Sequence, residues 1–152
     1  MRTERAGRPG RGRAARARRA AARALCALPC AALLGAGAAG HAYAPAVEYA
    51  LHCQGCHLDD GRATPGSVPA LAGVVGRLVR TPEGRAYLVR VPGVAQAPLS
   101  DAALAALLTW VVARFGGADA PPAFEPYRAD EVGALRRSPL VDVGAARRAL
   151  VP

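Results

Sequence analysis

Cys53, Gln54, Gly55, Cys56 and His57 form a CxxCH run whose residue types and spacing suit the attachment of a flat macrocycle. On a helix, positions i, i+3 and i+4 lie close together on one face, so both thiols and the imidazole can meet one ligand. Two such thiols add to the vinyl groups of a haem, and the following histidine offers a nitrogen to iron. The run predicts one covalent haem c, attached at Cys53 and Cys56, with His57 as an iron ligand.

Other chemistries of this run fit the sequence less well. A thioredoxin-type redox pair needs a βαβ context, whereas the surrounding chain is rich in Ala, Leu and Val at helical spacing. A structural zinc site needs four ligands from separated segments, and the chain beyond residue 44 offers only His52, Cys53, Cys56 and His57. A disulfide across a two-residue gap would leave His57 without a role.

The first 44 residues are typical of an export signal. Nine arginines and one glutamate lie between Met1 and Arg23, an apolar stretch follows over 24–39, and Ala42-Tyr43-Ala44 offers a cleavage site of small residues. The apolar stretch is short for a membrane span, and Pro29 interrupts it. We therefore expect cleavage near Ala44, export by the general secretory route and a periplasmic protein that is not integral to the membrane. A start codon downstream of Met1 would also explain the long basic stretch.

The positive charge of the chain belongs mainly to this leader. The formal net charge is +9, and nine arginines against one glutamate place +8 of it before residue 45. The remaining 108 residues (152 less 44) therefore carry about +1, too little to indicate a nucleic-acid partner.

Apolar periodicity in those 108 residues predicts an all-α domain. Helices are expected over 46–56, 71–79, 82–89, 101–115, 129–137 and 143–150, and loops over 62–70, 91–98 and 119–126. The helix over 101–115 has the clearest pattern, with Ser100 as N-cap, Gly116 and Gly117 as its stop and one apolar stripe formed by Leu104, Leu107, Leu108, Val111, Val112 and Phe115. Trp110 lies off the centre of this stripe and is expected to pack in the core.

The helix bearing CxxCH, a proline-containing loop and a closing amphipathic helix resemble a class I cytochrome c domain over residues 46–116. This resemblance implies a small helical domain wrapped around one covalent haem, over 45–118, followed by a Pro-rich linker and short helices over 119–152. It also implies that the carbonyl of Pro69, in Val68-Pro69-Ala70-Leu71, accepts a hydrogen bond from the proximal histidine, and that Leu71 lines the haem pocket.

The chain departs from this family at the second iron ligand, which is usually a methionine before the last helix. Met1 is the single methionine, there is no lysine, and His52 adjoins Cys53 on the proximal side. Gln96 and Tyr87 are weak candidates for the sixth ligand. We expect water, a weak oxygen ligand or an empty position there, and hence a lowered reduction potential.

Three functions remain open. The first is a periplasmic electron carrier that serves a periplasmic or membrane-bound oxidoreductase and is not an enzyme. The second is a haem-based ligand binder, sensor or peroxide-handling protein that uses an open iron position. The third is a subunit of a larger oxidoreductase that docks through an arginine patch formed by Arg136, Arg137, Arg147 and Arg148.

Overall fold

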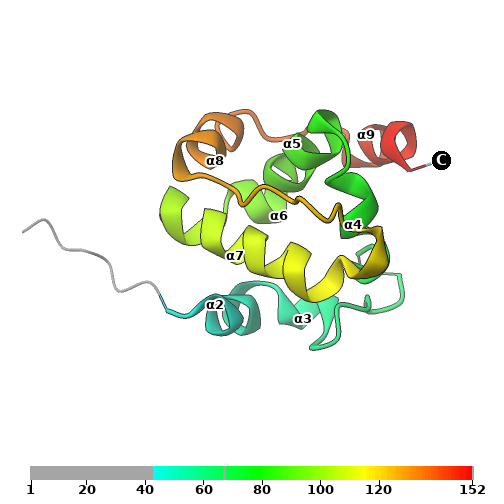
Figure 1. The fold of residues 1–152 in the computed structure, drawn as a ribbon, viewed down its shortest axis with the longest axis horizontal. Helices are drawn as coiled ribbons and strands as arrows, with labels where there is room; N and C mark the ends of the chain where they lie inside the picture. Colours follow the sequence, from blue (N-terminus) through cyan, green and yellow to red (C-terminus); the bar gives the residue numbers. More distant parts are fainter. Residues whose placement is uncertain (1–42, 67, 152) are drawn as a thin grey trace, which may run out of the picture. The chain divides into compact units, whose positions relative to one another are not determined.

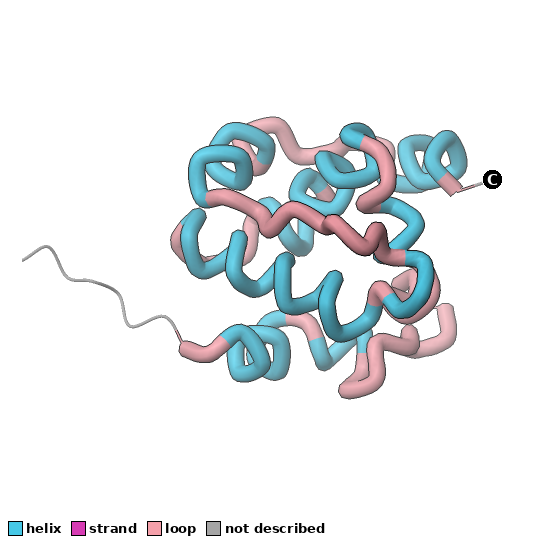
Figure 2. The backbone as a smooth tube through the Cα atoms, in the orientation of Figure 1, coloured by secondary structure: helices cyan, strands magenta, loops and turns pink. Residues whose placement is uncertain are grey.

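The computed structural model describes residues 43–66 and 68–151, which fold into helices joined by loops, with no strand among them (Figure 1, Figure 2). This confirms the predicted all-α class. The predicted export signal lies outside the described residues, apart from Tyr43 and Ala44. The elements are α2 (Pro45–His52), α3 (Gln54–His57), α4 (Val75–Leu78), α5 (Pro82–Arg90), α6 (Pro92–Ala95), α7 (Asp101–Phe115), the 3-10 helix η1 (Gly117–Asp119), α8 (Ala129–Leu135) and α9 (Val143–Leu150).

Helix α7 is the central element, and it has the bounds that the sequence predicts. The Ser100 hydroxyl accepts a hydrogen bond of 3.2 Å from the amide of Ala103, which caps the N-terminus. Its predicted apolar stripe is buried, and it contacts α2, α4 and α8 (Figure 1). Burial of this stripe supplies the apolar core on which the other helices pack.

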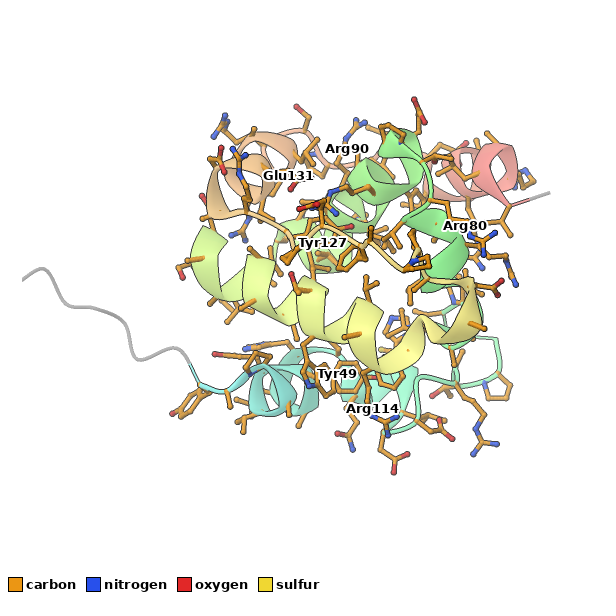
Figure 3. The ribbon with its side chains drawn as sticks, in the orientation of Figure 1. Tyr49, Arg80, Arg90, Arg114, Tyr127 and Glu131 are labelled. Atoms are coloured by element: carbon orange, nitrogen blue, oxygen red, sulfur yellow. The ribbon has the colours of Figure 1, made fainter. Side chains whose placement is uncertain are left out.

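An aromatic cluster joins α2 to α7. The ring of Tyr49 lies 5.3 Å from Trp110 and 5.2 Å from Phe115 between ring centroids, and Trp110 meets Phe115 edge-on at 5.8 Å. Figure 3 shows Tyr49 between the two helices. Trp110 therefore packs in the core, as expected, and the cluster holds the CxxCH segment against the central helix.

Three expected elements differ from the structure by more than a residue or two at one end. The helix predicted over 46–56 is divided at Cys53, whose φ of −127° separates α2 from α3. The helix expected over 71–79 is limited to Val75–Leu78, because Gly73 has a φ of +71° that a right-handed helix excludes. Residues 91–98 were expected to be a loop, but Pro92 provides a favourable first residue for the single turn of α6.

The segment after η1 packs on α5 through Arg85. The Arg85 guanidinium donates to Glu131 at 2.6 Å and to the carbonyl oxygen of Glu125 at 2.7 Å, and it lies 4.0 Å from the ring centroid of Tyr127. The buried Tyr127 hydroxyl returns a 3.0 Å hydrogen bond to the carbonyl oxygen of Arg85. These contacts fix α8 and the linker on α5.

Helix α9 is tied to the end of α5. The amide of Leu140 donates to the carbonyl oxygen of Arg90 at 2.8 Å, and Arg90 Nε donates to the carbonyl oxygen of Ser138 at 2.7 Å. The Asp142 carboxylate accepts from the amide of Ala145 at 2.7 Å and caps α9. The hydrogen bonds of the segment between α8 and α9 thus place α9 beside α5 (Figure 1).

The four arginines of the extension do not form the single patch that the sequence suggested. Arg136 points inward and donates to Ala95, Ala97, Leu99 and Asp101. Arg137 and Arg148 are exposed, and Arg147 is half-buried.

Within residues 43–66 and 68–151, none of the helices has the length and apolarity that crossing a membrane requires.

Candidate functional site

The CxxCH segment forms a tight helical turn at the junction of α2 and α3. The amide of Cys53 donates to the carbonyl oxygen of Tyr49 at 2.9 Å, and the carbonyl oxygen of Cys53 accepts from the amide of His57 at 3.0 Å. The division of the predicted helix therefore leaves Cys53 and His57 one turn apart. Cys53 is half-buried, whereas Cys56 is exposed.

The thiol of Cys53 is poorly suited to redox or nucleophilic chemistry of its own. Burial, together with the neighbouring Cys56, raises the pKa of the Cys53 thiol to about 11. Reactive cysteines instead have a lowered pKa in an electropositive environment. This environment disfavours a thioredoxin-type dithiol and is compatible with a thiol that is consumed in a covalent attachment.

His57 has a buried ring nitrogen whose bonding capacity is not used. Its Nδ1 atom has no hydrogen-bond partner among the described residues. Burial lowers the pKa of His57, and the nearby backbone carbonyl of Pro69 opposes that shift, although it does not have the geometry of a hydrogen bond to Nδ1. A neutral imidazole with a free lone pair is the form that binds a metal ion.

A folded loop brings Pro69 and Leu71 to this histidine. The amide of Leu71 donates to the carbonyl oxygen of Gly61 at 2.8 Å, which closes the loop over 62–70. Gly61 has a φ of +76°, and a Cβ atom there would lie 2.6 Å from the ring of Phe115. Glycine at position 61 therefore allows the loop to return close to α7.

Two cavities meet at His57. The inner one, of about 60 Å³, is lined by Cys53, His57 and apolar residues, among them Leu107 and Val111 of α7. The outer one, of about 290 Å³, is lined by His57, Pro69 and Tyr87 among others. Both cavities share the five lining residues His57, Leu71, Val75, Leu88 and Val94. We refer to the two together as the apolar cleft.

Most of the residues that the sequence singled out border this cleft. Cys53, His57, Pro69, Leu71 and Tyr87 line it. Cys56 does not line either cavity and lies at the surface one turn away.

The other candidate for the sixth ligand, Gln96, and the excluded His52 lie outside the cleft. Gln96 is exposed at the end of α6 and does not line the cleft. His52 pairs with the buried carboxylate of Glu48, with 3.3 Å between Nε2 and Oε2, on the α2 side.

The cleft also has lining residues from a part of the chain that the sequence did not connect with the site. Val143 and Arg147 of α9 line the outer cavity together with His57. Their i, i+4 spacing puts both on one face of α9, and this was the available signal. No local pattern indicates which other helix that face contacts.

The lining of the cleft suits an apolar group that carries a metal ion. Its walls are mainly aliphatic, it contains one imidazole with an unpartnered nitrogen, and a thiol stands at its inner end. A bare metal site fits less well, because the described residues include no group of three or more His, Cys, Asp or Glu side chains that could bind one. An aliphatic cleft with few polar groups is typical of a cofactor pocket.

Comparison with known proteins identifies two similar chains, while no family model matches. A Cytochrome c-552 of Thermus thermophilus is 32% identical over 127 residues, covering 72% of this chain and 86% of the relative. Another Cytochrome c-552 of the same species is 33% identical over 106 residues, covering 58% of this chain and 81% of the relative.

Proposed function

Since the chain belongs to the class I c-type cytochromes, which carry covalently bound haem c and transfer electrons, we propose that it is a periplasmic carrier of single electrons. In this proposal Cys53 and Cys56 attach the haem and His57 binds its iron. The bound haem supplies a centre that alternates between Fe(III) and Fe(II). The partner would be a periplasmic or membrane-bound oxidoreductase.

The observation that carries this proposal is the buried, unpartnered Nδ1 of His57 beside the apolar cleft. Burial lowers the pKa of this histidine and so favours its neutral form, and the carbonyl of Pro69 is available to orient the ring. Leu71 and the apolar residues of α7 line the same region and give it few polar groups. Low polarity around an iron centre is one of the factors by which a protein sets its reduction potential.

We further propose that no methionine, lysine or second histidine of the chain binds the other side of the iron. Among the residues that line the apolar cleft, Tyr87 and Arg147 are the polar side chains besides Cys53 and His57. Tyr87 is buried there, whereas Gln96 is exposed. Water or a weak oxygen ligand at the sixth position would lower the potential relative to a thioether ligand.

Haem attachment is tested by producing the full chain in a host that matures c-type cytochromes. The intact mass and the pyridine haemochrome spectrum of the exported protein should report one haem held by two thioether bonds. Cys53→Ala and Cys56→Ala should each leave a single thioether bond. A mature protein without covalent haem would contradict the proposal.

The iron ligand is tested by a matched pair of histidine variants. His57→Ala should change the Soret band and the spin state, because it removes the proposed iron ligand. His52→Ala should leave both unchanged, because His52 pairs with Glu48 on α2. Equal spectral changes in the two variants would contradict the assignment of His57.

The nature of the sixth ligand is tested with carbon monoxide, and the electron-carrier role is tested with peroxide. A weak or exchangeable ligand predicts a high-spin ferric electron paramagnetic resonance signal and rapid binding of carbon monoxide to the ferrous protein. A low-spin spectrum that resists carbon monoxide would show a strong protein ligand instead. Turnover of peroxide by the purified protein would favour catalysis over electron transfer.

Export and cleavage are tested on the same preparation. The protein should fractionate with the periplasm, and the mass of its N-terminus should place cleavage near Ala44. A cytoplasmic or uncleaved product would contradict this part of the proposal.

A further inference from the structure

Arg147 introduces a positive charge into an otherwise aliphatic part of the apolar cleft. It is half-buried on α9 and lines the outer cavity with His57, Pro69 and Tyr87. Its guanidinium forms no ion pair with any described acidic residue, in contrast to Arg85 and Arg136. A charge that is partly removed from water without a partner is costly, which indicates that an anion completes this site.

Tyr87 adds a second polar group without a partner to the same cavity. Its ring is buried, with 6% of the residue exposed. Its hydroxyl makes none of the side-chain hydrogen bonds found among the described residues, but it is not fully buried, because His57 Nδ1 is the one fully buried side-chain nitrogen or oxygen atom without a partner there. The other two buried tyrosines differ in this respect. The hydroxyl of Tyr49 donates to the carbonyl oxygen of Leu58 at 2.6 Å, and that of Tyr127 donates to the carbonyl oxygen of Arg85 at 3.0 Å. A guanidinium and a phenol that line one cavity suit a carboxylate.

The order of residues along the cleft identifies the source of that carboxylate. Cys53 lines the inner cavity, His57 lines both cavities, and Tyr87 and Arg147 line the outer one. In a haem, the vinyl groups that form thioethers and the two propionates stand on opposite edges of the ring. Cys53 and His57 would hold the vinyl side of a bound haem at the inner end of the cleft, and Tyr87 and Arg147 would then be the polar side chains available to its propionates at the outer end.

We propose that Arg147 and Tyr87 bind a haem propionate, so that α9 of the C-terminal extension forms one wall of the haem site. This inference rests on the proposed attachment of haem at Cys53 and Cys56. It also gives the extension a role, because the ties between Leu140, Ser138 and Arg90 set the position from which Arg147 enters the cleft.

The neighbouring Arg148 provides a matched control. It lies on the same helix, is exposed, and does not line the apolar cleft. Its Nη1 atom lies over Gly144, 3.3 Å from the position of a Cβ there, and so it follows the outer surface of α9. Arg147→Gln and Arg148→Gln therefore remove the same charge from two sides of one helix.

The test is a spectroelectrochemical titration of the two exported holoproteins. Loss of a positive charge beside a propionate disfavours reduction of Fe(III) to Fe(II). Arg147→Gln should therefore make reduction about tenfold less favourable, which lowers the reduction potential by about 59 mV. Arg148→Gln should leave the potential unchanged, and Arg147→Lys should recover part of the loss. Tyr87→Phe should lower the potential by a smaller amount, whereas Tyr127→Phe should not.

Hydrogen exchange gives a readout that does not depend on redox chemistry. In holoprotein, the amides of α9 should lose protection in Arg147→Gln and keep it in Arg148→Gln. Equal potentials and equal α9 protection in the two variants, with haem still attached, would overturn this inference and leave the proposed function intact. Absence of covalent haem from the wild-type protein would instead overturn the proposed function.

Repeating the measurement of the reduction potential with and without phosphate identifies the anion. If the haem propionate is the partner, the difference between wild type and Arg147→Gln should be the same in buffers with and without inorganic phosphate. A difference that arises only when phosphate is added would assign the site to a free anion and overturn the inference.

Discussion

Arg136, at the end of α8, donates a 2.6 Å hydrogen bond from Nη2 to the carbonyl oxygen of Ala97, which lines the inner cavity of the apolar cleft. The same guanidinium donates to the carbonyl oxygens of Ala95 at 2.9 Å and Leu99 at 2.8 Å, and to the Asp101 carboxylate at 3.1 Å. One side chain of the extension thus holds the chain between α6 and α7, the segment in which this family usually places its methionine ligand.

Arg136→Ala should destabilise the protein by about 2–3 kcal/mol, because it leaves three backbone carbonyls without their charged donor. Only 17% of the Arg136 side chain is exposed, so water replaces these contacts poorly. Urea unfolding of the holoprotein measures the change, and the exposed Arg137→Ala serves as control, with an expected change within about 0.5 kcal/mol. Similar losses in both variants would show that Arg136 does not hold this segment.

Gly61→Ala should destabilise the loop that carries Pro69 and Leu71 through a steric clash. Gly61 and Gly73 both have positive φ, +76° and +71°, but of these two only Gly61 has a neighbour that a Cβ would meet, 2.6 Å away on Phe115. Gly73→Ala should therefore cost about 1 kcal/mol for backbone strain alone. Gly61→Ala should cost about 1–3 kcal/mol more because of overpacking. Thermal unfolding of the two variants compares the costs, and equal values would exclude the clash.

Tyr49→Phe should destabilise the protein by removing a hydrogen bond to Leu58, the residue that follows the proposed iron ligand. Leu58 has a φ of +57°, unusual for a residue with a side chain, and its carbonyl oxygen accepts the 2.6 Å hydrogen bond from Tyr49. Loss of the hydroxyl leaves that carbonyl without its partner, at a cost of about 1–2 kcal/mol. Chemical unfolding measures this, and the absorption spectrum shows whether His57 is displaced. An unchanged stability would mean that water replaces the hydroxyl.

The ion pair between Arg85 and Glu131 should make stability depend on acid pH. The hydrogen bonds from Arg85 lower the pKa of Glu131 below its ordinary value of 4.5. A carboxylate with a lowered pKa stabilises the fold above its unfolded pKa, and this contribution is lost as pH falls through the folded value. Unfolding free energies measured from pH 6 to pH 3 should decline less in Glu131→Gln than in wild type. The exposed Glu125→Gln should decline as wild type does.

Several elements of the fold follow from local sequence. Helix α7 matches its predicted bounds because its cap residue Ser100 and its apolar stripe act within the helix itself. Helix α9 also matches its predicted range of 143–150, for the same reason. The division at Cys53 and the turn of α6 were not predicted, because they depend on how short segments meet α7 and the loops around them.

The family and its cofactor could be inferred from the CxxCH run, because thioether attachment requires two thiols and a histidine at fixed short spacing, whatever the surrounding fold. The roles of the two Arg-Arg pairs, Arg136-Arg137 and Arg147-Arg148, could not be inferred from the sequence. Arg136 and Arg147 point inward and Arg137 and Arg148 outward, although each pair consists of identical neighbours. The groups that the inward arginines meet lie far away along the chain. Only the packing of α8 and α9 on the preceding helices brings the first arginine of each pair to the cleft or to the segment beside it.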